Sequence, residues 1–187
     1  MKSVLQKFIA SSVLLFATAA IAVAAPLNND TITKITQRLV AGSLTFQAPA
    51  DVALPDITVS TDQQTVTGTA SEWKVDDARG HKPSQAPGWS LTMTSTNLSD
   101  GAQEESVIPV TGLTITPTNL TANSGSLNGV SLGSSHTFSS TSDQATIATA
   151  TSTHGRGNFQ GDIDFSWIIP ANSDAATYQA TWTFTLQ

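Results

Sequence analysis

The sequence predicts an all-β protein, an antiparallel, Greek-key-like β-sandwich of about ten short strands. Past residue 30, apolar residues alternate with Thr or Ser, which is the pattern of strands that bury one face. No long stretch repeats its apolar residues with the period of a helix. Gly, Pro, Asn and Asp separate the alternating segments at short intervals, so turns rather than helices connect them.

The candidate strands share this alternation and are bounded by turn residues. They are residues 43–47, 56–60, 64–68, 72–77, 88–96, 106–117, 136–140, 145–150, 158–170 and 176–186. The stretch 119–135 is rich in Ser, Gly and Asn, and it predicts a surface loop or a weak strand. Since the last segment ends on Trp182, Phe184 and Leu186, we expect it to be paired and buried on one side.

Residues 1–24 have the layout of a secretory signal peptide. Two lysines precede an apolar run, and Ala22-Val23-Ala24 fits the small-x-small rule for cleavage. Ser and Thr interrupt the run, so it fits a membrane-spanning helix less well. We therefore expect a secreted protein whose residues 25–187 form a single domain with no membrane span.

The balance of charge excludes several partners. The chain has 14 acidic residues against eight basic ones, and cleavage of the leader removes two lysines. Such a chain is repelled by nucleic acid and by anionic lipid. Anionic wall polymers would repel it too, so attachment to a cell wall would depend on short-range contacts. There is no cysteine, which rules out disulfides and cysteine catalysis.

No motif for catalysis, a cofactor or a structural metal is present, and we expect none of the three. The chain lacks a Gly-x-Ser-x-Gly elbow, a His-Glu-x-x-His sequence and a nucleotide-binding glycine loop. His81 and His154 lie in Gly-containing loops and are interpreted as solvated histidines, although a metal site built on them stays open.

Three small clusters of carboxylates remain, at Asp76-Asp77, Glu104-Glu105 and Asp162-x-Asp164. Asp162 and Asp164 would share one face of a strand, because side chains alternate. They could bind Ca²⁺ with help from backbone carbonyls, or serve as a glycosidase pair. The alternative is a row of solvated acids paired with Arg79 or Arg156.

Four stretches, in order, resemble the WxL domain of bacterial surface proteins. They are "GSLTFQAP" (42–49), "VDDARGHKPSQAPGWSLTMTSTNLS" (75–99), "LTITPTNLT" (113–121) and the last 33 residues (155–187). The resemblance spans essentially the whole mature chain. Its signatures here are Gly88-Trp89 followed by Leu91, and Tyr178 followed by Trp182. The second Trp-x-Leu signature departs from the family, because Phe184 stands where Leu is usual.

The resemblance implies an exported all-β domain that attaches non-covalently to the cell wall, to peptidoglycan or another wall component, beside partner surface proteins. Two alternatives stay open. One is a structural or adhesive subunit that binds partner proteins or host matrix through its edge strands. The other is a calcium-dependent carbohydrate binder.

The tryptophans could form an exposed platform for sugars or belong to the core. Trp89 shares a strand face with Leu91, and Trp182 shares one with Phe184, so the alternation places both in the core. Trp73 is left undecided by its neighbours. Buried motif residues would identify the fold, and binding would then fall to loops at the ends of the sandwich.

The loop from Asp76 to Gly88 is the candidate binding site. Its donors, cation and carboxylates are Asp76, Asp77, Arg79, His81 and Lys82. Arg79 could hold a carboxylate of a wall peptide through two parallel hydrogen bonds. Alternatively, Arg79 forms a salt bridge with Asp76 or Asp77.

Overall fold

The computed structural model describes residues 36–102 and 106–187. The predicted signal peptide and the Glu104-Glu105 pair lie outside the described residues. The chain divides into two compact units, Met1–Arg38 and Leu39–Gln187. Of the first unit only residues 36–38 are described, as exposed coil. The second unit holds every strand discussed below.

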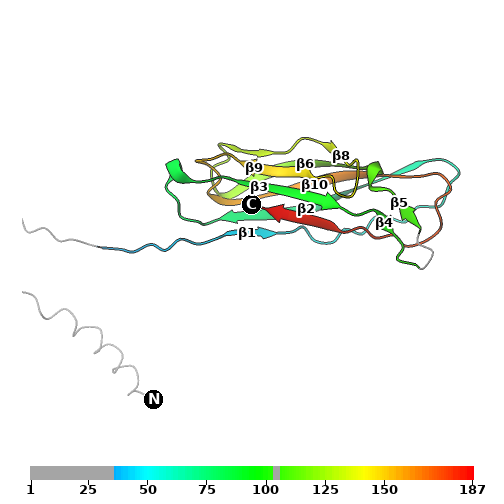
Figure 1. The fold of residues 1–187 in the computed structure, drawn as a ribbon, viewed down its shortest axis with the longest axis horizontal. Coiled ribbons are helices and arrows are strands. Elements are labelled where there is room, and N and C mark those ends of the chain that lie inside the picture. Colours follow the sequence, from blue (N-terminus) through cyan, green and yellow to red (C-terminus); the bar gives the residue numbers. More distant parts are fainter. Residues whose placement is uncertain (1–35, 103–105) are drawn as a thin grey trace, which may run out of the picture. The chain divides into compact units, whose positions relative to one another are not determined.

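Two antiparallel sheets form a β-sandwich, which confirms the predicted fold class (Figure 1). The first sheet has the order β1 (Leu44–Gln47), β2 (Gln64–Asp77), β10 (Gly157–Ile169), β6 (Leu113–Gly125), β8 (His136–Thr137). The second has the order β11 (Trp182–Leu186), β3 (Trp89–Ser95), β9 (Ala145–Ala150), β7 (Val130–Leu132). A short hairpin of β4 (Leu98–Ser99) and β5 (Val107–Ile108) stands apart, and two 3₁₀ turns, η1 (Pro83–Gln85) and η2 (Val110–Gly112), complete the elements.

From β2 onward, the main strands alternate between the two sheets. β2, β6, β8 and β10 belong to the first sheet, and β3, β7, β9 and β11 belong to the second. Strands that follow one another in sequence therefore face each other across the core instead of pairing. This topology sends the connecting loops over the two ends of the sandwich, where polar backbone can reach water.

Several expected boundaries differ from the structure. Residues 64–68 and 72–77 are parts of the single long strand β2, and β6 continues through Gly125 into the stretch expected to be a loop. The predicted strand at 56–60 is wrong, because these residues belong to no strand. Of the last predicted strand only Trp182–Leu186 is strand, preceded by an isolated bridge between Gln179 and Ser99.

Two β-bulges explain why the sequence pattern divided β2 into two predicted strands and ended β6 too early. The register shifts where β10 passes β2 and β6, and there Glu72 and Asn119 have φ angles of 64° and 56°. Both bulges are held by Asp162 on β10, whose carboxylate accepts bonds from the Glu72 N–H (2.9 Å) and Asn119 Nδ2 (2.8 Å). The polar residues thus bend the strands without ending them.

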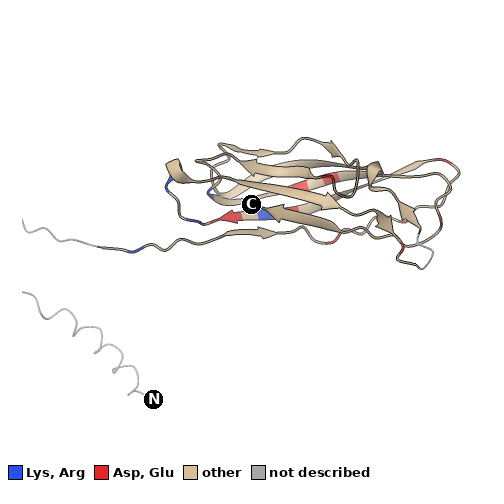
Figure 2. Cartoon of the chain, viewed as in Figure 1, with Lys and Arg blue, Asp and Glu red and all other residues tan. Residues whose placement is uncertain are grey.

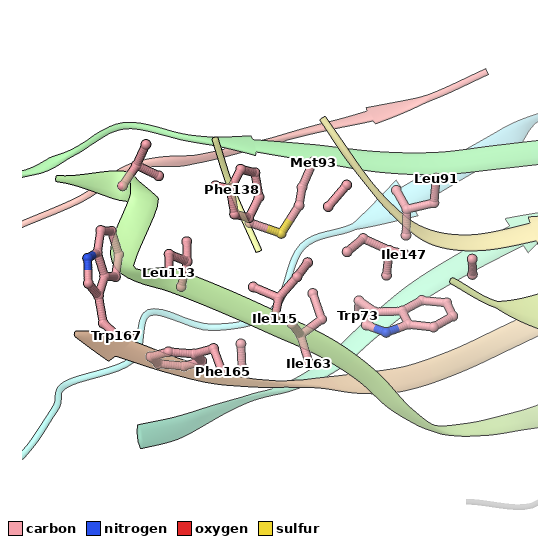
Figure 3. Packing of buried hydrophobic residues seen from close by; sticks show 14 of the residues in the cluster. Trp73, Leu91, Met93, Leu113, Ile115, Phe138, Ile147, Ile163, Phe165 and Trp167 are labelled. Carbon is pink, nitrogen blue, oxygen red and sulfur yellow. The ribbon is translucent and has the colours of Figure 1, made fainter. Parts of the chain in front are cut away.

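The core lies between the sheets and contains three of the four tryptophans, two of which, Trp73 and Trp167, are labelled in Figure 3. Trp73, Trp89 and Trp167 are 0%, 4% and 2% exposed, so their rings offer no open face to a ligand. Leu91 is fully buried beside them, as its strand alternation indicated. Trp182 is only partly buried and packs edge-on against Phe165, with ring centroids 5.1 Å apart.

Phe184, at the place of the usual leucine, is also partly buried. Its ring packs against Phe46 of β1, with a centroid separation of 5.2 Å. Because β1 and β11 are edge strands of different sheets, this pair closes one side of the sandwich. A large apolar side chain at position 184 thus keeps a packing role at the margin of the core.

Candidate functional site

The predicted binding loop connects β2 to β3 and is closed at its base by one ion pair. The Arg79 guanidinium donates to Asp77 Oδ1 from Nε (2.9 Å) and to Oδ2 from Nη2 (2.8 Å). Nη2 also donates to the carbonyl oxygen of Gly88 at 2.7 Å, at the far end of the loop. Arg79 therefore ties together the residues that enter and leave the loop.

The electrostatics keep this pair ionised. Burial of the Asp77 carboxyl raises its pKa, but the hydrogen bonds and charge of Arg79, with a contribution from the charge of His81, outweigh burial and leave the pKa below its usual value. The hydrogen bond to Asp77 in turn raises the pKa of Arg79. Arg79 was expected either to bind a ligand carboxylate or to form a salt bridge, and the structure contains the salt bridge. Nε and Nη2 of the guanidinium already donate to Asp77 and Gly88, so Arg79 is not free to hold a ligand.

The other three predicted residues of the loop face solvent. Asp76 lies on the outer side of β2, opposite Thr45 of β1 and Asn158 of β10, and it is exposed. His81 and Lys82 are exposed just before η1. Of the five residues predicted to bind, Asp77 and Arg79 hold the loop, whereas Asp76, His81 and Lys82 are available for contacts.

A second loop, residues 151–156, packs against the first and was not predicted as part of the site. The Thr153 N–H donates to the Ala86 carbonyl oxygen at 2.7 Å. The buried indole Nε1 of Trp89 donates to the Gly155 carbonyl oxygen at 2.9 Å. Phe159, just after this loop, packs against the Trp89 ring at 5.8 Å between centroids. We call the two joined loops, residues 78–88 and 151–156, the loop end.

Glycines permit this close approach. A Cβ on Gly155 would lie 2.3 Å from the Ala150 Cβ and 2.7 Å from Trp89 Nε1, and its φ is 83°. A Cβ on Gly88, whose φ is 77°, would lie 2.3 Å from the Ala150 carbonyl oxygen. Side chains would both clash and strain the backbone at these two positions. The signal in the sequence was the pair of glycines in "THGRGN", a motif too short to interpret by itself.

The closing motif lies elsewhere. The Tyr178 hydroxyl donates to the Asp174 carbonyl oxygen at 3.0 Å, and the neighbouring Gln179 bridges to Ser99 of β4. These contacts belong to the end of the sandwich with the β4–β5 hairpin. The structure thus brings Asp77, Arg79, Gly88 and Trp89 together with Gly155, but it does not bring Tyr178 or Trp182 to the loop end.

Basic residues gather toward the loop end, where β2 leads into β3 (Figure 2). Lys74 pairs with Glu72 at 3.4 Å, and Arg79 pairs with Asp77 at 2.8 Å. Lys82 and Arg156 are exposed and form no ion pair within the described part of the chain. The loop end therefore carries two cations that have no ion-pair partner among the described residues.

Asp162 and Asp164 share the outer face of β10, as predicted, but neither pairs with an arginine. Asp164 accepts hydrogen bonds from the hydroxyls of Thr69 (2.6 Å) and Thr118 (3.3 Å), and Asp162 holds the two bulges. The interpretation that they pair with Arg79 or Arg156 is wrong. Two shallow hollows lie on this polar face, one beside each aspartate. Within residues 36–102 and 106–187, no group of three or more His, Asp or Glu side chains is arranged to hold a metal ion.

One further cluster contains a serine, a carboxylate and a histidine. Asp143 Oδ2 accepts the Ser139 N–H and hydroxyl, both at 2.8 Å, and lies 3.2 Å from His136 Nε2. The Ser139 N–H, its hydroxyl and nearby His136 lower the pKa of Asp143 to about 2. In a hydrolytic triad the histidine stands between serine and carboxylate, whereas here the carboxylate stands between the other two. Ser139 has no base in this arrangement, and Asp143 instead caps the turn before β9.

Comparison with known proteins identifies no relative. No family model, no curated protein and no solved structure matches the chain. The resemblance to WxL domains therefore rests on the sequence motifs alone, and the function must be argued from the site.

Within the described residues, no helix is long and apolar enough to cross a membrane.

Proposed function

We propose that this chain is a secreted, non-enzymatic surface protein that attaches non-covalently to the bacterial cell wall, to peptidoglycan, through its loop end. One observation carries the proposal. One of the stretches that resemble a WxL domain, residues 75–99, is bonded to the loop 151–156 through Trp89 and Gly155, while His81, Lys82 and Arg156 remain exposed. A rigid base with free polar side chains is suited to binding a ligand without loss of loop entropy.

The burial of the aromatic residues favours binding by polar loops. Sugar binding by stacking needs an open aromatic face, and Trp73, Trp89 and Trp167 are all buried. The net charge of −6 at pH 7 opposes long-range attraction to anionic wall polymers. Both observations favour hydrogen bonds and close ion pairs at the loop end as the contacts with the wall.

Sedimentation with purified peptidoglycan tests the proposal. We expect the mature chain, residues 25–187, to pellet with peptidoglycan at moderate salt, and to stay in solution with an insoluble glycan of unrelated structure such as cellulose. The proposal fails if the folded chain remains in the supernatant with peptidoglycan. Adding a chelator to the same assay tests whether binding depends on calcium.

A second candidate function, a structural subunit that adds strands to a partner, has its own supporting observation. β1 pairs only with Lys74–Asp77 of the long strand β2. Among the described residues, no backbone hydrogen bond joins residues 48–59 to the rest of that edge. Val52, Ile57 and Val59 beside it are 40%, 42% and 48% exposed. An unpaired edge with exposed apolar residues is a template for strand addition.

Sedimentation velocity over a range of protein concentrations tests this second function. If copies of the chain assemble through this edge, the sedimentation coefficient should rise with protein concentration. The I57K/V59K variant should then stay monomeric. The matched control is V107K, which places a charge at another exposed apolar residue, on β5. A monomer at all concentrations, or assembly that both variants leave intact, rejects assembly through this edge.

A further inference from the structure

We infer that Lys82 and Arg156 form a two-cation site that binds the carboxylate groups of peptides. The inference rests on the proposed function, because it names the part of the wall that the loop end would hold. Neither cation was paired with the other in the sequence prediction, since they lie in different loops.

Both loops are fixed close to the cations. Lys82 precedes η1, and its carbonyl oxygen accepts the Gln85 N–H at 2.8 Å. The next residue, Ala86, accepts the Thr153 N–H at 2.7 Å. On the other side, Arg156 directly follows Gly155, whose carbonyl is held by the Trp89 indole at 2.9 Å. Hydrogen bonds thus hold the two backbones, while the Lys82 and Arg156 residues are exposed.

The charges at this end leave both cations available. Asp77 is occupied by Arg79, and Glu72 is occupied by Lys74. Asp76 is the other acid near the loop, and it forms no ion pair with Lys82 or Arg156. Because neither Lys82 nor Arg156 forms an ion pair within the described residues, the two cations create a local attraction for an anion.

The two side chains offer complementary chemistry for a carboxylate. A guanidinium binds a carboxylate through two parallel hydrogen bonds, and an ammonium adds a compact charge with three donors. Half-buried His154 precedes Arg156 by two residues, and its Nδ1 lies near the hydroxyls of Thr151 (3.1 Å) and Thr153 (3.2 Å). These bonds fix the shape of the loop next to the proposed site.

The overall charge favours a peptide carboxylate over a polyphosphate. Ionic interactions at physiological salt reach about 8 Å. A short peptide end can bind at the loop end without reaching Asp162 and Asp164 on β10. A long phosphate polymer that continued over the outer face of the first sheet would be repelled by those two acids.

The test compares K82Q/R156Q with wild type and with K74Q, which removes a cation outside the loop end. Both target side chains are exposed, so thermal unfolding should show all three proteins folded. We expect the double variant to bind peptidoglycan about tenfold to a hundredfold more weakly, as loss of charge-assisted hydrogen bonds produces, and K74Q to bind like wild type. Peptidoglycan whose carboxylates have been converted to amides should bind wild type as weakly as the double variant.

Two results overturn the inference and leave the proposed function standing. One is equal binding of wild type and K82Q/R156Q to peptidoglycan. The other is unchanged binding of wild type to amidated peptidoglycan together with competition by purified teichoic acid, which would identify phosphate as the anion.

A soluble probe separates the two proposals if wild type fails to pellet. N-acetyl-alanyl-alanine should shift the NMR signals of Lys82 and Arg156, and its C-terminal amide should not. Such shifts without pelleting would reject the wall proposal and keep the carboxylate site. The absence of shifts with the free acid would overturn the carboxylate site.

Discussion

Acids lie both at the end of β2, where it enters the loop end, and on the outer face of the first sheet, but their bonds differ. At the end of β2, Asp77 is buried and paired with Arg79, with side chains 2% and 21% exposed. On the outer face, Asp162 and Asp164 are bonded to hydroxyls, an amide and a backbone N–H at the surface. A buried pair holds backbone segments together strongly, whereas surface bonds compete with water. The comparison separates an acid whose lost partner should destabilise the fold strongly from acids whose bonds water can replace.

The largest loss of stability is expected for Trp89, the buried residue that directly follows the loop end. Trp89→Ala removes a ring that is 4% exposed and packed on Phe159, and it leaves the Gly155 carbonyl without its partner. We expect a loss of about 3–5 kcal/mol in the free energy of unfolding, measured by urea denaturation. Unchanged stability of the variant would show that Trp89 is not part of the core.

The ion pair should come next. Arg79→Ala leaves the Asp77 carboxylate buried without its cation, so we expect a loss of about 3 kcal/mol in the free energy of unfolding. Lys74→Ala is the matched control, because the Lys74–Glu72 pair is exposed at 30% and 65%, and such a pair is worth about 0–1 kcal/mol. Equal losses of unfolding free energy in the two variants would contradict the view that the buried ion pair stabilises the fold more than the exposed one.

The same ion pair predicts a dependence on pH. The folded-state pKa of Asp77 lies below its unfolded value, so the stability from the pair is present above about pH 4 and is lost as pH falls below it. The difference in unfolding free energy between wild type and Arg79→Ala should therefore shrink as pH falls from about 5 to about 2. Urea denaturation at several pH values measures it. A constant difference would mean that the carboxylate does not carry the effect.

The smallest effects are expected on the outer face. Asp162→Ala should cost about 1 kcal/mol, because Asp162 holds both bulges, including the Glu72 backbone N–H. Asp164→Ala should cost about 0.5 kcal/mol, since its two threonine partners can turn to water. Urea denaturation of both variants gives the order. A larger loss for Asp164→Ala would contradict the structural role assigned to Asp162.

The sequence predicted the features that depend on local alternation. Trp89 and Leu91 lie on one face of their strand, and both are buried. The same reasoning was wrong for residues 56–60. Ile57 and Val59 alternate with polar residues, yet no strand pairs with them and both are exposed. Alternation indicates which residues could share a face, but it does not supply a partner strand.

The remaining features depend on contacts between distant residues. The bulge at Glu72 is held by Asp162, which lies 90 residues away, so the break in the pattern of β2 looked like a turn. The loop 151–156 joins the site through a bond between Trp89 and Gly155, which are 66 residues apart. Only the Asp77–Arg79 pair joins residues that are close in sequence, two positions apart, and could be predicted. The sequence still left a second role open for Arg79, the binding of a ligand carboxylate.

Exchanging one loop at a time tests the central claim most directly. One variant replaces residues 81–85 with a Gly/Ser stretch of equal length and keeps the ion pair of Asp77 and Arg79. Its control replaces residues 100–102, beyond β4, in the same way. After both proteins are shown to fold, pelleting with purified peptidoglycan is measured. We predict that the first variant stays in the supernatant and that the control pellets like wild type. Pelleting of the first variant at the wild-type level would contradict attachment through the loop end.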